Sequence, residues 1–323
     1  MQNFSDIQNL VREDLKAVDD LLINRLESEV ALINQVSSYI INAGGKRIRP
    51  LLVVLMSRAL GYQGINHHVM AVVIELIHTA TLIHDDIVDE SEVRRGTETP
   101  NQVWGNAASV LVGDFIYSRA FEIMVEPNSM EIMKVLSKAT NAIAEGEVLQ
   151  LLNIGNKELN EADYLKVIEK KTACLFQAAT QIAAIISDSD SSIENRMKSF
   201  GLNLGNAFQI VDDVLDYQSN EELLGKRIGD DLSEGKMTLP LIHSLSNSSK
   251  ATNKKLRDII SNNNVEEIDT VLEIFQETGS IDYTINRAKE ISVKAKHCLV
   301  NLNESAYKNA LSLLCDISVE RIS

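Results

Sequence analysis

The chain has 323 residues, of which 45% are hydrophobic, and its formal net charge is -15. This negative charge argues against non-specific binding to nucleic acid, because the phosphate backbone repels an acidic surface. Only 4 prolines and 15 glycines occur, and this low content of helix breakers favours helices.

Apolar residues recur at intervals of three and four along most of the chain, which predicts a series of amphipathic helices. Convincing strand alternation and repeats of fixed period are absent from the sequence. The polar segments 187–194 and 246–255 are predicted to be solvated loops. We therefore expect one all-α domain over residues 1–323. In chain order, the predicted helices cover 4–22, 28–42, 50–60, 68–90, 103–125, 130–152, 161–186, 193–218, 237–246, 253–261, 265–277, 281–302 and 304–320.

Cysteine usage and the amino terminus indicate where the protein works. Cys174, Cys298 and Cys315 show no metal-like spacing, and this low, odd number suits a reducing cytosol. The first twenty residues are mixed and acidic, with no apolar signal core. The apolar runs are too short or too interrupted to span a bilayer. We therefore expect a soluble cytoplasmic protein without a transmembrane segment, and contact with a membrane surface stays open.

The stretch "LIHDDIVDE" ends the predicted helix 68–90 with Asp85, Asp86 and Asp89. Residues four apart lie about 40° apart around a helix, so these aspartates project from one side. Acids are disfavoured at a helix C-terminus, where the dipole is negative. A hard cation such as Mg²⁺, which bridges carboxylates to substrate phosphates, would resolve this conflict. For a single motif of this kind, a solvated helix end is an equal alternative.

The same pattern returns in "FQIVDDVLDY", which places Asp212, Asp213 and Asp216 after another apolar helical run. Two such motifs are far less expected by chance than one. Facing each other across a cavity, they would hold several Mg²⁺ ions, up to three, around a diphosphate. An HD-type metal phosphohydrolase is the weaker reading of His84 beside Asp85, because few further histidines are available as ligands.

Basic residues gather in short runs around these two acidic centres. The stretch "GGKRIRP" offers Lys46, Arg47 and Arg49 on a glycine-led turn into a helix, and a helix N-terminus favours anions. Arginine grips phosphate oxygens bidentately and lysine acts as a point charge. The cations are enough for two diphosphates, one held through metal and one held directly. The other polar residues of these runs are Arg94, Arg95, Lys170, Lys171, Thr172, Lys226, Asp230, Asp231 and Lys236.

With these motifs the chain resembles the trans-isoprenyl diphosphate synthases. The resemblance runs through "GGKRIRP", "IHTATLIHDDIVDESEVRRG", "AEGEVLQL", "KTACLFQAA", "FQIVDDVLDY" and "GKRIGDDLSEGKMTLPL". It is strongest to bacterial long-chain members that make an octaprenyl product for quinone side chains. One departure is Met237, where relatives commonly have proline, and we expect only a local loop effect. The resemblance implies the all-α isoprenoid synthase fold, a bundle of mostly antiparallel helices around a deep central cavity, usually as a homodimer.

The resemblance also implies a reaction, in which isopentenyl diphosphate is condensed onto an allylic diphosphate such as farnesyl diphosphate. It implies that Asp85 and Asp89, with Asp86 nearby, and Asp212, with Asp213 and Asp216 nearby, bind Mg²⁺ at the allylic diphosphate. Lys46, Arg49, His78 and Arg95 match positions that bind isopentenyl diphosphate. Arg94, Lys171, Thr172, Gln209 and Lys226 match positions that bind the allylic substrate, and Lys236 is expected to join them. Without the resemblance, Thr172, Gln209 and His78 would be read as ordinary hydrogen-bonded residues.

In this family the chain length of the product depends on the residue at the fifth position before the first aspartate, where a bulky side chain stops growth early. That position is Ala80, and the neighbouring Thr81 and Ile77 are not aromatic either. We therefore expect a long product, and contact with a membrane during its release is compatible with the sequence. Three alternatives stay open: a shorter-chain synthase, a terpene cyclase, which needs no second diphosphate site, and a non-catalytic partner subunit, which usually loses one acidic motif.

Overall fold

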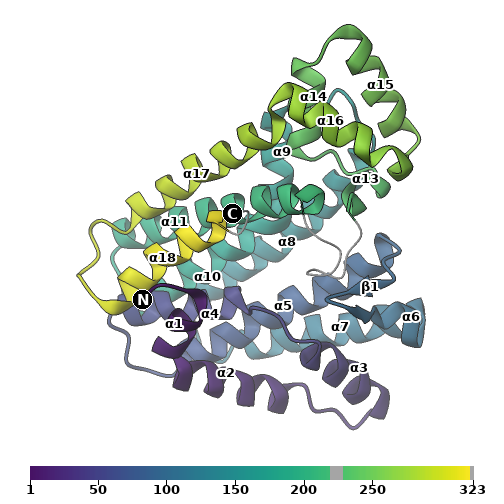
Figure 1. The fold of residues 1–323 in the computed structure, drawn as a ribbon. Coiled ribbons are helices and arrows are strands. Elements are labelled where there is room, and N and C mark those ends of the chain that lie inside the picture. The colour runs from purple at the N-terminus through teal and green to yellow at the C-terminus, as the bar shows by residue number, and fades with distance from the viewer. Residues whose placement is uncertain (219–227, 321–323) are drawn as a thin grey trace. The chain divides into compact units, whose positions relative to one another are not determined.

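The computed structural model describes residues 1–218 and 228–320. Residue contacts divide the chain into two compact units. Unit 1 comprises Met1–Thr140, Leu175–Gly201 and Cys298–Leu314, and unit 2 comprises Asn141–Cys174, Leu202–His297 and Cys315–Ser323. Apart from one short hairpin, the regular structure of the described residues is helical, so the all-α prediction is confirmed (Figure 1). The expectation of a single domain stays a prediction. Among the described helices, none is long and apolar enough to cross a membrane.

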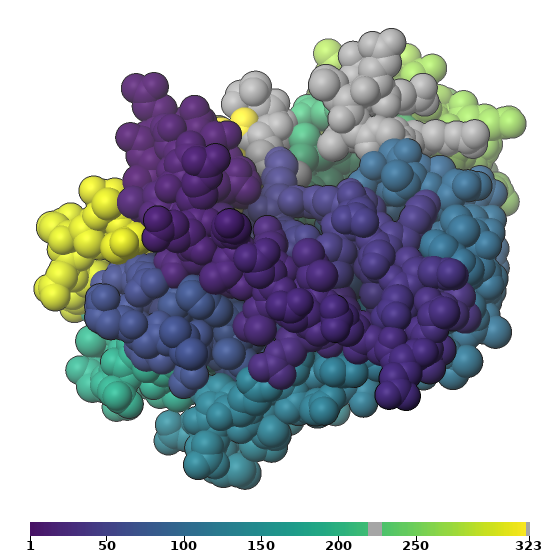
Figure 2. Space-filling view, turned by 90° about the horizontal axis from the view of Figure 1, so that it is seen from below, coloured from purple at the N-terminus to yellow at the C-terminus, as the bar shows by residue number. Residues whose placement is uncertain are grey.

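Unit 1 is organised around one long helix, α5 (Asn66–Val88), which packs against α2, α4 and α7 (Figure 1). Helix α5 is buried along most of its length because its apolar residues occupy nearly every turn. The space-filling view shows the N-terminal helices of this unit, in purple, on the surface (Figure 2). The other elements wholly within unit 1 are α1 (Phe4–Leu10), α2 (Arg12–Arg25), α3 (Ala31–Asn42), α4 (Ile48–Ala59), β1 (Val93–Arg94), β2 (Thr97–Glu98), α6 (Pro100–Trp104) and α7 (Asn106–Ile123).

Unit 2 has a core shared by its short helices and by α11, in which Tyr164, Tyr217 and Phe275 are buried. Helices α14, α15 and α16 pack on one another (Figure 1). The elements wholly within unit 2 are α9 (Glu161–Ile168), the π-helical turn η1 (Glu169–Ala173), α13 (Asp230–Ser233), α14 (Leu239–Asn247), α15 (Lys250–Ser261), η2 (Val265–Glu267) and α16 (Ile268–Thr278). Among the described helices, five contribute residues to both units: α8 (Met130–Leu152), α10 (Cys174–Ile186), α11 (Ser191–Gln218), α17 (Ser280–Cys298) and α18 (Ala306–Glu320).

Several local predictions were wrong. The helix predicted over 103–125 is divided at Gly105, whose φ of 80° separates α6 from α7. The helix predicted over 4–22 divides at Val11, whose backbone leaves the helical region. The loop predicted over 246–255 is mostly helix, because Ser249 caps α15 by accepting a hydrogen bond from the Thr252 amide at 3.2 Å. The other predicted loop shortens in the same way, since α11 already begins at Ser191. Polar residues that resembled solvated loops therefore lie at helix starts.

The β1–β2 hairpin had no signal in the sequence, because two residues per strand are too few to show alternation. Its strands pair Val93 with Glu98 and Arg94 with Thr97. The two turn residues, Arg95 and Gly96, have φ of 55° and 77°. Positive φ at both central positions is the geometry of a type I′ turn, which matches the twist of a tight hairpin. This turn places Arg94 and Arg95 at the tip of a compact loop after α5.

A partly buried carboxylate ties α2 to α4 and α5. Asp14 accepts hydrogen bonds from Arg58 at 2.6 and 2.9 Å, from His68 at 2.8 Å and from His67 at 3.1 Å. Burial raises the pKa of Asp14, but these bonds together hold it well below the ordinary value. Burial lowers the pKa of His67 from 6.5 to about 4, so this ring stays neutral in the folded protein. The network therefore joins three helices around a neutral His67 ring.

We expect acid to destabilise the protein through His67. Between pH 6.5 and 4 the unfolded chain binds a proton at this residue and the folded chain does not. The free energy of unfolding should then fall as the pH is lowered, by up to about 1.4 kcal/mol per pH unit from this one site. Urea denaturation at several pH values should show a shallower dependence for His67→Gln than for the wild type. His297→Gln, which removes an exposed histidine, is the control, and an unchanged slope for His67→Gln would contradict the prediction.

Candidate active site

The first acidic motif lies at the C-terminal end of α5, where Asp85, Asp86 and Asp89 differ in burial. Asp86 is 3% exposed, and its Oδ1 accepts a hydrogen bond from Arg94 Nε at 2.6 Å. Burial raises the pKa of Asp86, and the charge of Arg94 opposes that shift. Asp85 and Asp89 are only partly buried. The middle carboxylate is thus bound to the protein itself, and the two flanking carboxylates remain more exposed.

The second acidic motif repeats this arrangement on α11. Asp213 is 4% exposed and accepts hydrogen bonds from Tyr164 Oη at 2.6 Å and from Gln209 Nε2 at 2.9 Å. Burial raises the pKa of Asp213 to about 8, with a further contribution from the charge of Asp231. Asp212 and Asp216 are partly buried. Each motif therefore pairs one enclosed carboxylate with two flanking ones.

The flanking carboxylates suit a hard divalent cation. Asp85 and Asp89 lie about one helical turn apart on α5, and Asp212 and Asp216 have the same spacing on α11. Carboxylate oxygens are the ligands that Mg²⁺ takes, and it typically keeps waters and substrate phosphate oxygens in its remaining positions. The residues present therefore fit Mg²⁺ better than a metal that prefers nitrogen or sulfur ligands.

In unit 1, Arg49 and His78 are in direct contact. Arg49 Nη1 lies 2.8 Å from His78 Nε2, and the Arg49 guanidinium lies 4.7 Å from the centre of the Phe176 ring. A guanidinium only donates, so His78 Nε2 accepts and the ring proton is on Nδ1. Burial and the neighbouring positive charges of Arg49 and Arg95 hold the pKa of His78 well below its ordinary value. The structure therefore brings the predicted residues Arg49 and Arg95 near the neutral imidazole of His78.

The glycine-led turn before α4 makes room for Arg95. Arg95 Nη1 donates a hydrogen bond to the Gly44 carbonyl, and a Cβ at Gly45 would lie 2.5 Å from that same nitrogen. Lys46 is exposed in this turn. Arg47 instead contacts Asp19 on α2 at 2.6 Å, so its guanidinium is paired with a carboxylate of the protein.

One residue of this region was not predicted. Glu75, on α5, has its pKa raised by burial and lowered by the charges of Arg47, Arg49 and Arg95. An acid within an apolar helix was the sequence signal, but nothing in the pattern indicated which cations surround it. Glu75 supplies the negative charge that makes a cluster of arginines tolerable there.

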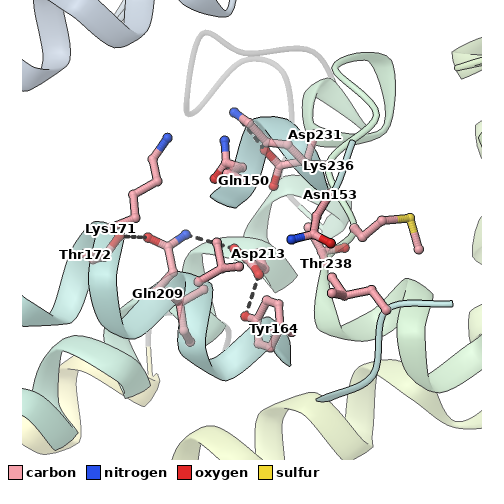
Figure 3. A pocket seen from close by; sticks show the side chains of 14 residues that line it. Gln150, Asn153, Tyr164, Lys171, Thr172, Gln209, Asp213, Asp231, Lys236 and Thr238 are labelled. Atoms are coloured by element: carbon pink, nitrogen blue, oxygen red, sulfur yellow. Dashed lines mark hydrogen bonds and ion pairs between the residues drawn. The ribbon is translucent and has the colours of Figure 1, made fainter. Parts of the chain in front are cut away.

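Unit 2 contains a pocket with a volume of about 110 Å³ (Figure 3). Thr172 Oγ1 donates to Gln209 Oε1 at 2.8 Å, and Lys171 Nζ lies 2.6 Å from Glu147 Oε2. Lys236 pairs with Glu234 and lies 3.8 Å from Asp231. The predicted residues that line this pocket are Lys171, Thr172, Gln209, Asp213, Asp231 and Lys236.

Other pocket residues were missed, and one predicted residue lies outside the described chain. Tyr164, Gln150 and Asn153 also line the pocket. Tyr164 fits the apolar period of its helix, so the sequence did not distinguish it from an ordinary core residue. Lys226, predicted to bind the allylic substrate, lies outside the described residues.

The residues predicted to set chain length lie on α5. Ala80 and Ile77 are fully buried. Thr81 is partly buried, and its hydroxyl donates to the His78 carbonyl at 2.8 Å. The small side chain of Ala80 therefore belongs to the inside of unit 1. The sequence also suggests Met124, Met133 or Leu136 as the floor of a tunnel. Met124 and Leu136 are buried and Met133 is partly buried, and their role stays a prediction.

A close backbone contact positions Lys171 and Thr172. The sequence predicted one helix over 161–186, but the segment is interrupted by the π-helical turn η1, which carries both residues. A Cβ at Gly146 of α8 would lie 2.5 Å from the Lys171 amide nitrogen and 2.8 Å from its Cα. Only glycine permits this approach, so Gly146 sets how closely α8 and η1 pack. π-helical turns frequently mark functional sites.

Comparisons with known proteins agree with these motifs. A family model described as "Polyprenyl synthetase" matches residues 30–278. The chain is 47% identical to octaprenyl diphosphate synthase of Haemophilus influenzae, over 99% of this chain and 98% of that protein. It is 45% identical to octaprenyl diphosphate synthase of Escherichia coli, over 99% of both chains.

A solved structure confirms the expected fold. Polyprenyl synthase from Caulobacter crescentus, complexed with calcium and isoprenyl diphosphate, has a TM-score of 0.96 and 39% identity. The match covers 100% of this chain and 99% of that one. The all-α isoprenoid synthase fold that the sequence predicted is therefore confirmed.

We expect Gly146→Ala to impair the site although alanine is the better helix former. In an exposed helix this change would stabilise by about 1 kcal/mol. Here the new methyl meets the backbone of Lys171, so η1 must shift. Steady-state kinetics should show turnover reduced by about 10- to 100-fold, because misplacement on the ångström scale is enough. Circular dichroism must show a retained fold, and a folded variant with unchanged kinetics would contradict the argument.

Proposed function

The chain belongs to the polyprenyl synthetase family, and we propose that it condenses isopentenyl diphosphate repeatedly onto an allylic diphosphate such as farnesyl diphosphate, with octaprenyl diphosphate as its product. The single observation that carries the proposal is the repeated acidic motif, in which one carboxylate is enclosed and two flank it. The names of the two relatives that are 45% and 47% identical support the octaprenyl length. The product then supplies the side chain of a quinone, ubiquinone or menaquinone.

The proposed metal is Mg²⁺, held by Asp85, Asp89, Asp212 and Asp216, with up to three ions per site. The Caulobacter structure is complexed with calcium and isoprenyl diphosphate, and this supports a divalent cation in the proposed site. Bound Mg²⁺ would supply charge neutralisation at the leaving diphosphate. Asp86 and Asp213 contribute indirectly in this proposal, because each is hydrogen-bonded to the protein and thereby fixes the helix end that carries its neighbours.

The two diphosphates are assigned to different cation groups. Lys46, Arg49 and Arg95, around the neutral ring of His78, bind isopentenyl diphosphate. Lys171, Lys236 and Lys226 bind the allylic diphosphate. Arg94 was predicted to join the second group, and its contact with Asp86 supports a role in which one guanidinium serves both the motif and the substrate.

The chemistry follows from these assignments. The carbon–oxygen bond of the allylic diphosphate breaks and leaves a cation at the allylic carbon. The double bond of isopentenyl diphosphate attacks that carbon, and a new carbon–carbon bond forms. A proton then leaves the adjacent carbon for the departing diphosphate, which restores a double bond. Thr172 and Gln209 offer neutral dipoles to the cation, so they stabilise it without capturing it.

The growing chain is proposed to lie along α5. This helix has 23 residues, which corresponds to roughly 34 Å at about 1.5 Å per residue. Ala80 carries only a methyl group on this helix, so no bulky side chain blocks the proposed path at that level. This observation favours a long-chain product over a farnesyl-length one. We place the enzyme in the cytoplasm, with transient membrane contact when the product is released.

A homodimer is proposed through α7. Val110, Leu111 and Phe121 of this helix are 40%, 68% and 38% exposed. Val110 and Phe121 are eleven residues apart, so they lie about 20° apart around the helix, on one exposed side. Exposed apolar faces of this kind commonly pack against a second copy.

The test of the function is a condensation assay with farnesyl diphosphate, isopentenyl diphosphate and Mg²⁺. We expect octaprenyl diphosphate to form, and EDTA to abolish the activity until Mg²⁺ is restored. Asp85→Ala and Asp212→Ala should each lower turnover by about 100-fold or more, because each removes a charge that holds metal against diphosphate. Asp282→Ala, which removes an exposed acid of α17, should not. Products would be separated by chain length, and near-normal turnover of either site variant would refute the two-motif proposal.

The position of the tunnel is tested by Ala80→Phe. The ring should fill the level below the aspartates, so condensation should continue but stop near farnesyl or geranylgeranyl length. Overpacking costs about 1–3 kcal/mol, so the fold must be checked by circular dichroism. Ala71→Phe is the matched control, because Ala71 is equally buried on α5 but about 180° around the helix. A folded Ala80→Phe enzyme that still made the wild-type product would show that the chain grows elsewhere.

A further inference from the structure

A row of hydrogen bonds crosses the pocket of unit 2 (Figure 3). Thr172 Oγ1 donates to Gln209 Oε1 at 2.8 Å, and Gln209 Nε2 donates to Asp213 Oδ1 at 2.9 Å. Tyr164 Oη donates to the other carboxylate oxygen, Asp213 Oδ2, at 2.6 Å. Three elements supply the row, since Tyr164 comes from α9, Thr172 from η1 and the other two residues from α11.

The direction of each bond follows from what its partner can do. The amide nitrogen of Gln209 only donates and its amide oxygen only accepts, and the nitrogen is the atom that meets Asp213. The donor end of Gln209 therefore faces Asp213, and its acceptor end faces Thr172. The hydroxyl hydrogen of Thr172 is then used by Gln209, so the Thr172 oxygen has only lone pairs to offer a group in the pocket.

Reversal of this amide would change the electrostatics at the reacting carbon. A flipped Gln209 would present its donor end to Thr172 and release the hydroxyl hydrogen of that residue. A hydrogen turned toward an allylic cation repels it, whereas oxygen lone pairs attract it. The orientation shown therefore favours ionisation of the allylic diphosphate, and the flipped one opposes it.

Tyr164 is the residue that keeps the row in this orientation. It is 3% exposed, and its hydroxyl holds one oxygen of the Asp213 carboxylate. With that oxygen held, the carboxylate cannot rotate, and its other oxygen stays directed at Gln209, four residues earlier on α11. Without the phenol hydroxyl of Tyr164, the side chain of Asp213, which is 4% exposed, would lose one of its two side-chain donors. It would then rotate to regain a hydrogen bond.

We propose that Tyr164 is a positioning residue of the condensation reaction: through Asp213 and Gln209 it directs the hydroxyl hydrogen of Thr172 away from the allylic cation. The residue touches no reacting atom in this proposal and acts only through the row. The inference rests on the proposed function, because it assigns the cation of that reaction to this pocket.

Tyr164→Phe removes the hydroxyl and keeps the ring. We expect kcat to fall by about 10- to 100-fold, as for other residues that orient catalytic groups, while KM for each diphosphate changes by less than about twofold. Tyr217→Phe is the matched control, because Tyr217 is 2% exposed in the same unit and its hydroxyl contacts Thr238 Oγ1 at 3.2 Å instead of a carboxylate. The control should keep kcat within about twofold. An equal loss in both variants would indicate a merely structural role and overturn the proposal.

A double-mutant cycle with Thr172→Val separates this inference from the proposed function. Valine keeps the shape of Thr172 and removes the hydroxyl, so Tyr164→Phe should cost nothing further in that background. Multiplied losses in the double variant, or an unchanged kcat for Tyr164→Phe alone, would overturn the role of Tyr164. If the wild type formed no prenyl product at all, the proposed function would be refuted. An active wild type with an impaired Thr172→Val variant would support that function, whatever the result for Tyr164→Phe.

Discussion

A carboxylate taken out of water is costly unless the protein supplies donors or an opposite charge, and each acidic motif encloses one such group. Arg94 donates a hydrogen bond to Asp86, and Tyr164 and Gln209 donate hydrogen bonds to Asp213. The enclosed carboxylate ties its helix end to a neighbouring element. The flanking aspartates then keep fixed positions, and the rest of the site is arranged around them. Repulsion among three adjacent acids is reduced because one of them is neutralised or hydrogen-bonded by the chain itself.

Much of the fold and of the site could be predicted from local sequence. Apolar periodicity located the long helices, because a buried helix repeats its apolar residues every three to four positions. The spacing of Asp85 and Asp89, repeated at Asp212 and Asp216, was enough by itself to indicate two oxygen-rich centres. Short-range features of this kind are encoded within one or two turns of a helix. The comparisons confirm the family that these motifs indicated.

Other features depend on residues distant in sequence, and these were not predicted. Tyr164 stands 49 residues before Asp213, and its place in an apolar period concealed its polar role. The π-helical turn at Glu169–Ala173 depends on a glycine of α8, which no pattern within the segment itself could indicate. The short hairpin depends on positive φ at Arg95 and Gly96, and an arginine in the sequence does not predict positive φ. Residue types predicted the kind of chemistry at the site. They did not predict which side chains hydrogen-bond to one another.

The hairpin after α5 also limits how this chain can diverge. Arg94 ends β1 and contacts Asp86, whereas the next residue, Arg95, begins the turn and contacts Gly44. Two neighbouring guanidinium groups thus have different partners, and in the proposed function they bind different diphosphates. Only their order along the backbone determines which group goes to which partner. Loss or gain of a single residue here would shift the register and move both groups at once. Most surface loops accumulate insertions and deletions freely, so among related sequences this one should vary in composition but hardly in length.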